Sequence, residues 1–201
     1  MEARGLVPRP PSRSPRTLRC RVPDASTAIP SSLSAEELVD RYHRGMYALA
    51  LDLTGNHHDA EDLSQEVLIK ACESLDSYRG DAKPFTWLYR IAVNTYLNRR
   101  RRQENQATTL QGDFERTSDG VGAAPQTGER AERHQMQEHI EAALDALSPR
   151  ERSAFVLKHE HDLRIKDVAA SMDVAPGTVK SLLYRATRKL RDELAFYRDQ
   201  L

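Results

Sequence analysis

The sequence predicts an all-α protein of two small helical bundles joined by a flexible linker, with a helix-turn-helix in the second bundle. Apolar residues recur at three- and four-residue steps in both halves of the chain, and no stretch alternates as a strand does. A polar, glycine-containing segment at 103–135 separates the halves, as expected of a linker. The 201 residues suffice for two such modules, predicted at 34–102 and 136–201.

Basic and acidic residues are concentrated in different segments of the chain, although the net charge is zero. The 30 basic and 30 acidic residues cancel, whereas a nucleic-acid-binding domain is usually basic. However, residues 99–102 are four consecutive arginines, and 174–191 hold basic residues without an acidic one. The acidic residues gather elsewhere, notably at 59–62. The balance therefore does not exclude a nucleic-acid partner.

Cysteine usage and hydropathy indicate a cytoplasmic protein. Cys20 and Cys72 are the two cysteines, and neither has the spacing of a metal or redox site. No apolar run approaches the ~20 residues of a membrane-spanning helix, so no membrane insertion is expected. Residues 1–33 hold six of the ten prolines and predict a disordered, Arg- and Pro-rich tail. A start codon placed too far upstream would explain that segment equally well.

Three helices are expected in the first module. The first begins at Ser34 and ends at Gly55-Asn56, and the second carries acidic residues in its first turn, where the helix dipole favours them. The third begins at Pro84, after a loop at 76–83, because proline suits the first helical turn. Their apolar stripes are Leu38, Tyr42, Met46, Leu49 and Leu53; then Ala60, Leu63, Val67, Ala71 and Leu75; then Phe85, Leu88, Ile91, Ala92 and Thr95.

The second module ends in a pattern typical of a helix-turn-helix. A stripe from Met136 to Leu147 precedes Ser148-Pro149-Arg150-Glu151, which combines a capping box with proline at the first helical position. Helices follow at about 165–172 and 176–196, separated by three residues. In such a motif the second helix enters the major groove of duplex DNA.

The last helix separates an apolar stripe from a basic face. Val179, Leu183, Ala186, Leu190 and Leu194 are expected to face the core. The opposite side can contact base edges and phosphates, and Thr178 suits a phosphate contact or a helix cap. That side consists of Ser181, Tyr184 and Arg188, flanked by Lys180 and Arg185. The pattern favours binding to duplex DNA over a merely solvated face.

The third helix has a second face that suits a single strand. Trp87, Arg90, Asn94 and Asn98 recur at three- and four-residue steps and lead into the four arginines. Exposed bases stack on aromatic rings while cations follow the phosphates, and Tyr78 in the preceding loop adds a ring. The alternative, that Trp87 only packs against a neighbouring helix, remains open at this point.

Three motifs in order resemble the extracytoplasmic-function (ECF) group of sigma-70 RNA polymerase sigma factors. Asp59-Ala-Glu-Asp-Leu-Ser-Gln-Glu-Val67 is similar to the region that docks on polymerase. Leu75-Asp-Ser-Tyr-Arg-Gly-Asp81, with Thr86-Trp-Leu-Tyr-Arg-Ile-Ala-Val-Asn94, resembles the promoter-melting segment. Gly177-Thr-Val-Lys-Ser181, continued by Tyr184-Arg-Ala186, resembles the recognition helix.

The resemblance implies a role for each module. The first would bind the β′ clamp helices of core RNA polymerase and open the −10 promoter element, capturing a flipped base at Tyr78 and Asn94. The second would bind the duplex −35 element and rest on the β flap. The implied polymerase-binding residues are Asp59, Asp62, Gln65 and Glu66. For the −10 element they are Lys70, Tyr78, Arg79, Asp81, Trp87, Arg90, Asn94, Arg99 and Arg100, and for the −35 element Thr178, Lys180, Ser181, Tyr184, Arg185 and Arg188.

Further expectations follow from the same resemblance. It implies a stress or envelope-response regulon, an anti-sigma partner, and no catalytic residue, metal or cofactor. Leu182 and Thr187 stand where the group often has basic residues, which would weaken phosphate contacts, and Leu163 occupies a position that is often aromatic.

Two other classes of protein compete with this interpretation. A metal-dependent enzyme is suggested by His57 and His58 beside acidic residues, and by His159 with His161, but no complementary ligand set accompanies either pair. A helix-turn-helix regulator that acts without polymerase would carry a similar second module. The motifs at 59–67 and 86–94 favour the sigma factor, because such a regulator has no need of a single-strand face.

Overall fold

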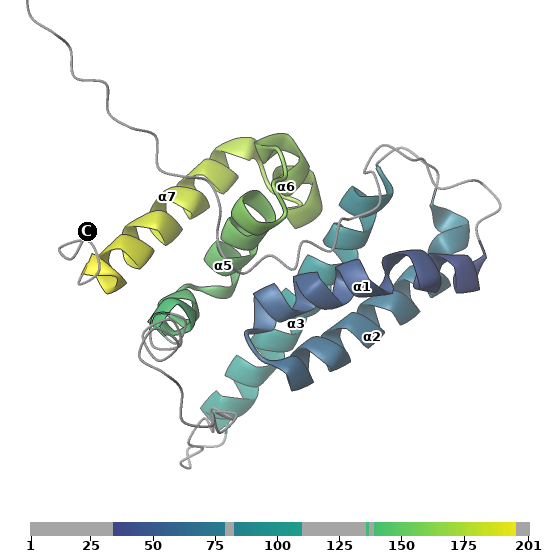
Figure 1. Cartoon of the computed structure of the whole chain (residues 1–201), viewed down its shortest axis with the longest axis horizontal. Coiled ribbons are helices and arrows are strands. Elements are labelled where there is room, and N and C mark those ends of the chain that lie inside the picture. The colour runs from purple at the N-terminus through teal and green to yellow at the C-terminus, as the bar shows by residue number, and fades with distance from the viewer. Residues whose placement is uncertain (1–33, 79–82, 110–135, 137–138, 196–201) are drawn as a thin grey trace, which may run out of the picture.

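A computed structural model describes residues 34–78, 83–109, 136 and 139–195. All of its regular elements in these ranges are helical, which confirms the all-α prediction. They are α1 (Ala35–Thr54), α2 (His57–Glu73), η1 (Leu75–Ser77), α3 (Pro84–Thr109), a helix at 139–145, α5 (Pro149–Phe155), η2 (Val156–Glu160), α6 (Ile165–Met172) and α7 (Pro176–Glu193). Figure 1 shows α1, α2 and α3 side by side, with α5, α6 and α7 grouped against them.

Local capping chemistry places the helix boundaries. Ser34 and Glu37 form a capping box at the start of α1, and Ser148 and Glu151 form the predicted one at the start of α5. Asn56 caps α2 by accepting a hydrogen bond from the backbone N–H of Asp59 at 2.8 Å. These side chains satisfy N–H groups that a helix start leaves without partners.

Gly55 ends α1 in a conformation that favours glycine. Its φ is 81°, and its N–H donates to the carbonyl of Leu51 at 2.8 Å. A Cβ at this position would lie 2.9 Å from the Arg152 guanidinium. Gly177, in the first turn of α7, has open space around its Cβ position and no positive φ.

These two glycines give a matched pair for stability. Gly55→Ala is expected to lower the free energy of unfolding by about 1–3 kcal/mol, because it strains the backbone and displaces Arg152. Gly177→Ala is expected to raise it by about 0.4–1 kcal/mol, because alanine restricts the unfolded chain at no steric cost. Urea unfolding of the full chain measures both, and equal effects would contradict the role given to Gly55.

The predicted apolar stripes form one core that joins the two modules. All five residues of the first stripe are buried, and so are Ala60, Leu63, Val67 and Ala71 of the second. Val168, Met172, Val179 and Leu182 belong to the same continuous cluster. The first module packs chiefly through α3 against α6. The sequence predicts two bundles on a linker, but no local pattern in it indicates that they share a core.

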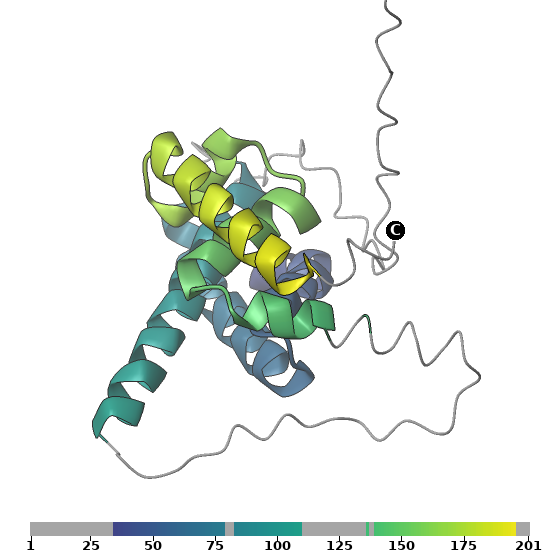
Figure 2. The same cartoon turned by 90° about the vertical axis from the view of Figure 1, so that its left-hand side faces the viewer.

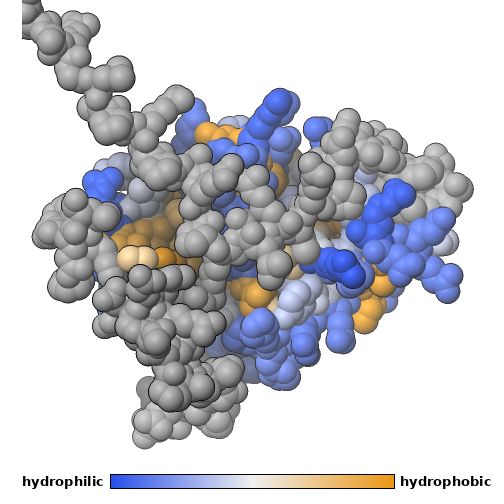
Figure 3. Space-filling model, viewed as in Figure 1, coloured by the Kyte–Doolittle hydropathy of each residue, from blue (hydrophilic) through white to orange (hydrophobic). Residues whose placement is uncertain are grey.

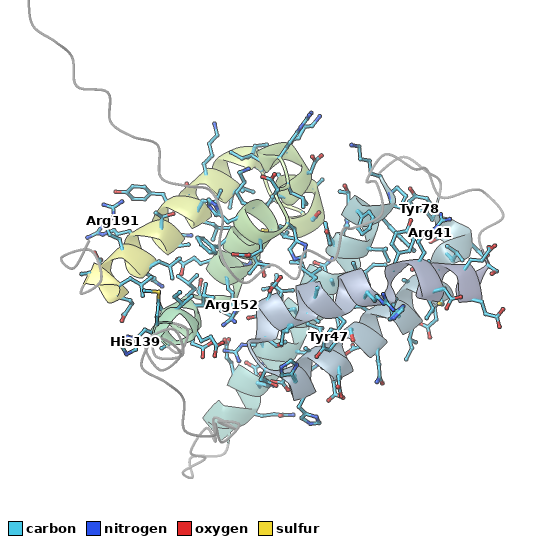
Figure 4. All side chains as sticks on the ribbon, viewed as in Figure 1. Arg41, Tyr47, Tyr78, His139, Arg152 and Arg191 are labelled. Atoms are coloured by element: carbon cyan, nitrogen blue, oxygen red, sulfur yellow. The ribbon has the colours of Figure 1, made fainter. Side chains whose placement is uncertain are left out.

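Polar contacts cross between the modules at the end of α1. Arg152 of α5 is 5% exposed, and its Nε donates to the carbonyl of Asp52 at 3.2 Å. The Asp52 carboxylate lies 3.1 Å from His161 Nε2, and the other ring nitrogen of His161 lies 3.2 Å from the Tyr89 hydroxyl. Burial, with a further contribution from the charge of Asp52, raises the pKa of Tyr89, which stays a neutral hydroxyl. Figure 4 shows Arg152 between the two groups of helices.

The third helix is longer than predicted. Sequence analysis placed the start of the linker at residue 103, whereas α3 continues to Thr109. Figure 2 shows these last turns extending beyond the other helices. The prediction was wrong because Gln103, Glu104 and Gln106 are good helix formers and the glycines come later, so the helix continues without an apolar stripe. The remainder of the predicted linker, at 110–135, lies outside the described residues, as does the predicted tail.

Leu182 corrects a second expectation. The family resemblance implies that Leu182, in place of a basic residue, weakens phosphate contacts, but its side chain is 3% exposed and belongs to the core cluster that contains Val179. Its apolar character therefore belongs to packing and removes no phosphate contact. On the described part of the face in Figure 3, hydrophilic side chains cover most of the surface and apolar ones form separate patches. No helix in the described ranges is both long and apolar enough to span a membrane.

Candidate nucleic-acid interface

The helix-turn-helix forms where the sequence predicts it. Between α6 and α7, Asp173 adopts a left-handed conformation with φ 54°, which aspartate tolerates better than most residues. The chain then enters α7 at Pro176, and Ala175 at the N-cap provides no side-chain cap. Thr178 is exposed in the first turn.

The outer face of α7 is exposed in the part of the chain that the structure describes. Lys180, Ser181, Arg188 and Tyr184 are exposed, and the Tyr184 side chain is 69% exposed. A large aromatic ring without cover on a basic helix is a feature of an interaction surface. The Ser181 hydroxyl donates to the carbonyl of Gly177 at 3.1 Å, which leaves its lone pairs available.

Arg185 on α7 has an ion-pair partner on α5. The buried carboxylate of Glu151 lies 3.2 Å from Arg185 Nε and 2.8 Å from Lys189 Nζ. Glu151 also closes the capping box through the backbone N–H of Ser148 at 3.0 Å. Burial alone would raise the pKa of Glu151, but hydrogen bonds from Lys189 and Ser148 lower it on balance. Arg185 thus links α7 to α5 besides facing outward.

Glu151→Gln is expected to lower the free energy of unfolding by about 2 kcal/mol at pH 7, because hydrogen bonds to a charged group are lost. The folded-state pKa of Glu151 is lowered, so its contribution is present above its unfolded pKa and fades as pH falls through the folded pKa. The wild-type and variant stabilities should therefore converge as pH decreases below about 4.5. Urea unfolding from pH 7 down to pH 3.5 measures this, and a constant difference would contradict it.

The predicted single-strand face of α3 has a tilted aromatic pair at one end. The rings of Tyr78 and Trp87 lie 5.0 Å apart at an angle of 45°. Trp87 is half-buried and packs against the core, as the packing interpretation expects, while its contact with a single strand stays a prediction. Asn94 and Asn98 are exposed along the same face. Arg90 lies at the edge, 3.7 Å from the Asp173 carboxylate of the second module.

The acidic helix α2 sends its predicted polymerase-binding residues in different directions. Asp62 and Gln65 are exposed on its outer face. Asp59 instead accepts a hydrogen bond from the Asn56 amide at 2.8 Å, as part of the helix start. Glu66 points toward α3, with Lys70 Nζ at 2.7 Å and Arg99 Nε at 2.6 Å. Four residues after Gln65, the exposed side chain of Ile69 continues the outer face, a feature that its spacing signals but that sequence analysis passed over.

Comparison with known proteins identifies both modules. The family model described as sigma-70 region 2 matches residues 38–106, and the one described as sigma-70 region 4 matches 137–190. The chain is 31% identical to the ECF RNA polymerase sigma-E factor of Haemophilus influenzae, over 78% of this chain and 85% of that protein. It belongs to the ECF group of sigma-70 factors.

Two further similarities place this sigma factor among its relatives. It is 36% identical to the ECF RNA polymerase sigma factor SigE of Mycolicibacterium smegmatis over 81% of this chain, but spans only 62% of that protein's length. A solved structure of the sigma factor RpoE in complex with the anti-sigma factor NepR, from Bartonella quintana, matches 80% of this chain and 96% of that one. The TM-score is 0.64 at 26% identity.

The remaining predicted residues of the sigma factor fall in three groups. Arg79 and Asp81 lie outside the described residues. Arg99 and Arg100 are half-buried, and Arg100 Nη1 donates to the Gln103 side chain at 3.5 Å. Among the histidines of the competing metal-site interpretation, His57 has a structural partner, because its Nδ1 lies 2.7 Å from the hydroxyl of Tyr47 on α1. Within the described ranges, no three His, Cys, Asp or Glu side chains group as metal ligands.

Proposed function

We propose that this sigma factor directs core RNA polymerase to promoters, with the second module on the duplex −35 element and the first opening the −10 element. The exposed face of α7 is the observation that carries the proposal, because a helix-turn-helix presents its second helix to the major groove. Lys180 and Arg188 would contact guanine edges or phosphates there, and Tyr184 a base or the sugar backbone.

The first module would bind polymerase and hold the unpaired strand, two roles that a protein binding only duplex DNA lacks. The outer face of α2, with Asp62 and Gln65, would meet the β′ clamp helices. The Tyr78–Trp87 pair and Asn94 would hold the unpaired strand of the −10 element, because stacking on aromatic rings and an amide edge suits exposed bases. Holding a flipped base offsets part of the unstacking cost of a few kcal/mol.

Regulation by an anti-sigma factor is also proposed, with a stress or envelope-response regulon as the target. The structural relative named above is a sigma factor bound to an anti-sigma factor, and its similarity covers both modules of this chain. A cytoplasmic location and the absence of a catalytic site accompany this role, since a sigma factor acts through the polymerase it joins. The second module would also rest on the β flap.

Run-off transcription with the full chain and purified core polymerase tests the proposal. Initiation from a specific start site is expected only when the chain, the core and a cognate promoter are all present. Arg188→Ala, on the open face of α7, should reduce initiation about tenfold, since a good base contact contributes about 1–3 kcal/mol. Replacing the −35 sequence should largely remove the difference between wild type and variant. Folded protein and active core that yield no specific transcript from any promoter would overturn the proposal.

A helix-turn-helix regulator without polymerase is the alternative. It predicts that the chain binds duplex promoter DNA with the same affinity whether or not core is present, and that α2 variants leave function unchanged. Asp62→Asn and Gln65→Ala distinguish the two roles, because only a sigma factor loses core affinity through them.

A further inference from the structure

Glu66 and two cations form a network between α2 and α3. The two carboxylate oxygens of Glu66 accept from different residues, Oε1 from Lys70 Nζ at 2.7 Å and Oε2 from Arg99 Nε at 2.6 Å. Lys70 also donates to the buried Thr95 hydroxyl at 3.2 Å, and Arg99 Nη2 to the carbonyl of Asp62 at 2.9 Å. The three charged side chains are 30–43% exposed, so solvent screens them only in part.

The network explains why Glu66 does not face outward with Asp62 and Gln65. A carboxylate that turned toward polymerase would have to leave two short, charge-assisted hydrogen bonds, which are among the stronger ones in proteins. Burial alone would raise the pKa of Glu66, but the hydrogen bonds and charges of Lys70 and Arg99 lower it on balance. The carboxylate therefore stays ionised as the shared partner of both cations.

The position of the two cations suggests what they are held for. Thr95, which Lys70 contacts, follows Asn94 in the chain, and Arg99 follows Asn98, so both cations lie along one edge of the exposed α3 face. Lysine and arginine have long, flexible side chains, and binding must otherwise remove the conformational entropy of each. Because both side chains bond to the Glu66 carboxylate, part of this entropy is already lost before DNA binds.

We propose that Glu66 is a positioning residue, which pre-orders Lys70 and Arg99 as a cationic edge for the phosphate backbone of the unpaired −10 strand, and is not a ligand of polymerase. This inference rests on the proposed function, since it assigns a role within the same DNA-binding face. It replaces the assignment of Glu66 that the family resemblance implied.

The test uses holoenzyme reconstituted from the full chain and core, bound to the single non-template strand of a promoter that run-off transcription identifies. Glu66→Gln should make the slope of log affinity against log salt more negative by about 0.7, because a freed cation neutralises about one more phosphate. It should also lower discrimination against a scrambled strand about tenfold, while core affinity stays within twofold of wild type. Glu66→Asp should restore the salt slope toward wild type, because it restores the charge.

Glu73→Gln provides the matched control, since it makes the same charge change at an exposed position at the end of α2. Its salt slope and discrimination should equal those of wild type. If Glu66→Gln fails to fold, the double variant Lys70→Gln/Arg99→Gln replaces it and should flatten the slope by about 0.7, because beside the Glu66 carboxylate the two cations together neutralise about one phosphate. A tenfold loss of core affinity in Glu66→Gln, or an unchanged slope in whichever variant folds, would overturn the inference. Wild-type holoenzyme that fails to bind the strand would instead count against the proposed function.

Discussion

Asn94→Ala is expected to reduce open-complex formation about 5- to 30-fold on a duplex promoter. Asn94 is exposed in the middle of α3, on the face that begins with the Tyr78–Trp87 pair, so its amide is available to a base. Losing a hydrogen bond to an unpaired base costs about 1–2 kcal/mol, which corresponds to that range. Permanganate footprinting of the −10 region with reconstituted holoenzyme measures the effect.

Two comparisons make the Asn94 result specific. Core affinity should stay within twofold of wild type, because α2 is unchanged, and the unfolding midpoint should not fall, because the side chain is exposed. Asn98→Ala, one turn further along the same face, should lose less than threefold. A parallel loss of core affinity, or equal losses at both positions, would show that the −10 assignment of Asn94 is wrong.

The sequence was sufficient to predict the helices because their signals are local. Capping boxes at Ser34 and Ser148, proline in the first turn of α7 and apolar stripes each act within a few residues. The exposed face of α7 followed from the same periodicity. Leu182 shows the limit of this reasoning: a wheel built on one stripe left it outside the core, while packing against neighbouring helices widened the buried sector to include it.

Partners distant in the chain were beyond sequence analysis. A pattern of charges does not show that Glu66 would turn toward Arg99, 33 residues away, or that Arg152 would reach Asp52 across 100 residues. Both contacts depend on how helices from different parts of the chain pack, which periodicity does not specify. The same limit explains why the two modules were expected to be separate although they share a core.

The shared core holds the two modules closer together than the two promoter elements of the proposed function are spaced. The −10 and −35 elements are centred about 25 base pairs apart, which is about 85 Å of duplex at about 3.4 Å per pair. A compact body of this size has a radius of gyration of about 15 Å and a diameter of about 40 Å. The packed arrangement therefore cannot contact both elements at once. Under the proposed function the modules would have to part, and the contacts between them would oppose that step.

His161→Ala is accordingly expected to raise the apparent affinity for core polymerase, by up to about 30-fold. The His161 ring bonds both Asp52 and Tyr89 of the first module, and losing two such bonds removes about 2 kcal/mol from the packed state. If only the opened protein binds core, its apparent affinity rises in proportion to the opened fraction. Small-angle scattering of the free chain should show a larger radius of gyration, and competition for core should show tighter binding.

His159→Ala is the matched control, because His159 packs on Phe155 within its own module, with ring centroids 4.7 Å apart. It should leave both the radius of gyration and core affinity unchanged. If His161→Ala opened the chain without tightening core binding, opening would not limit assembly. If neither quantity changed, contacts such as that of Arg152 with Asp52 would hold the modules together without His161. Only a joint change, confined to His161, supports packing of the modules as the barrier that polymerase must overcome.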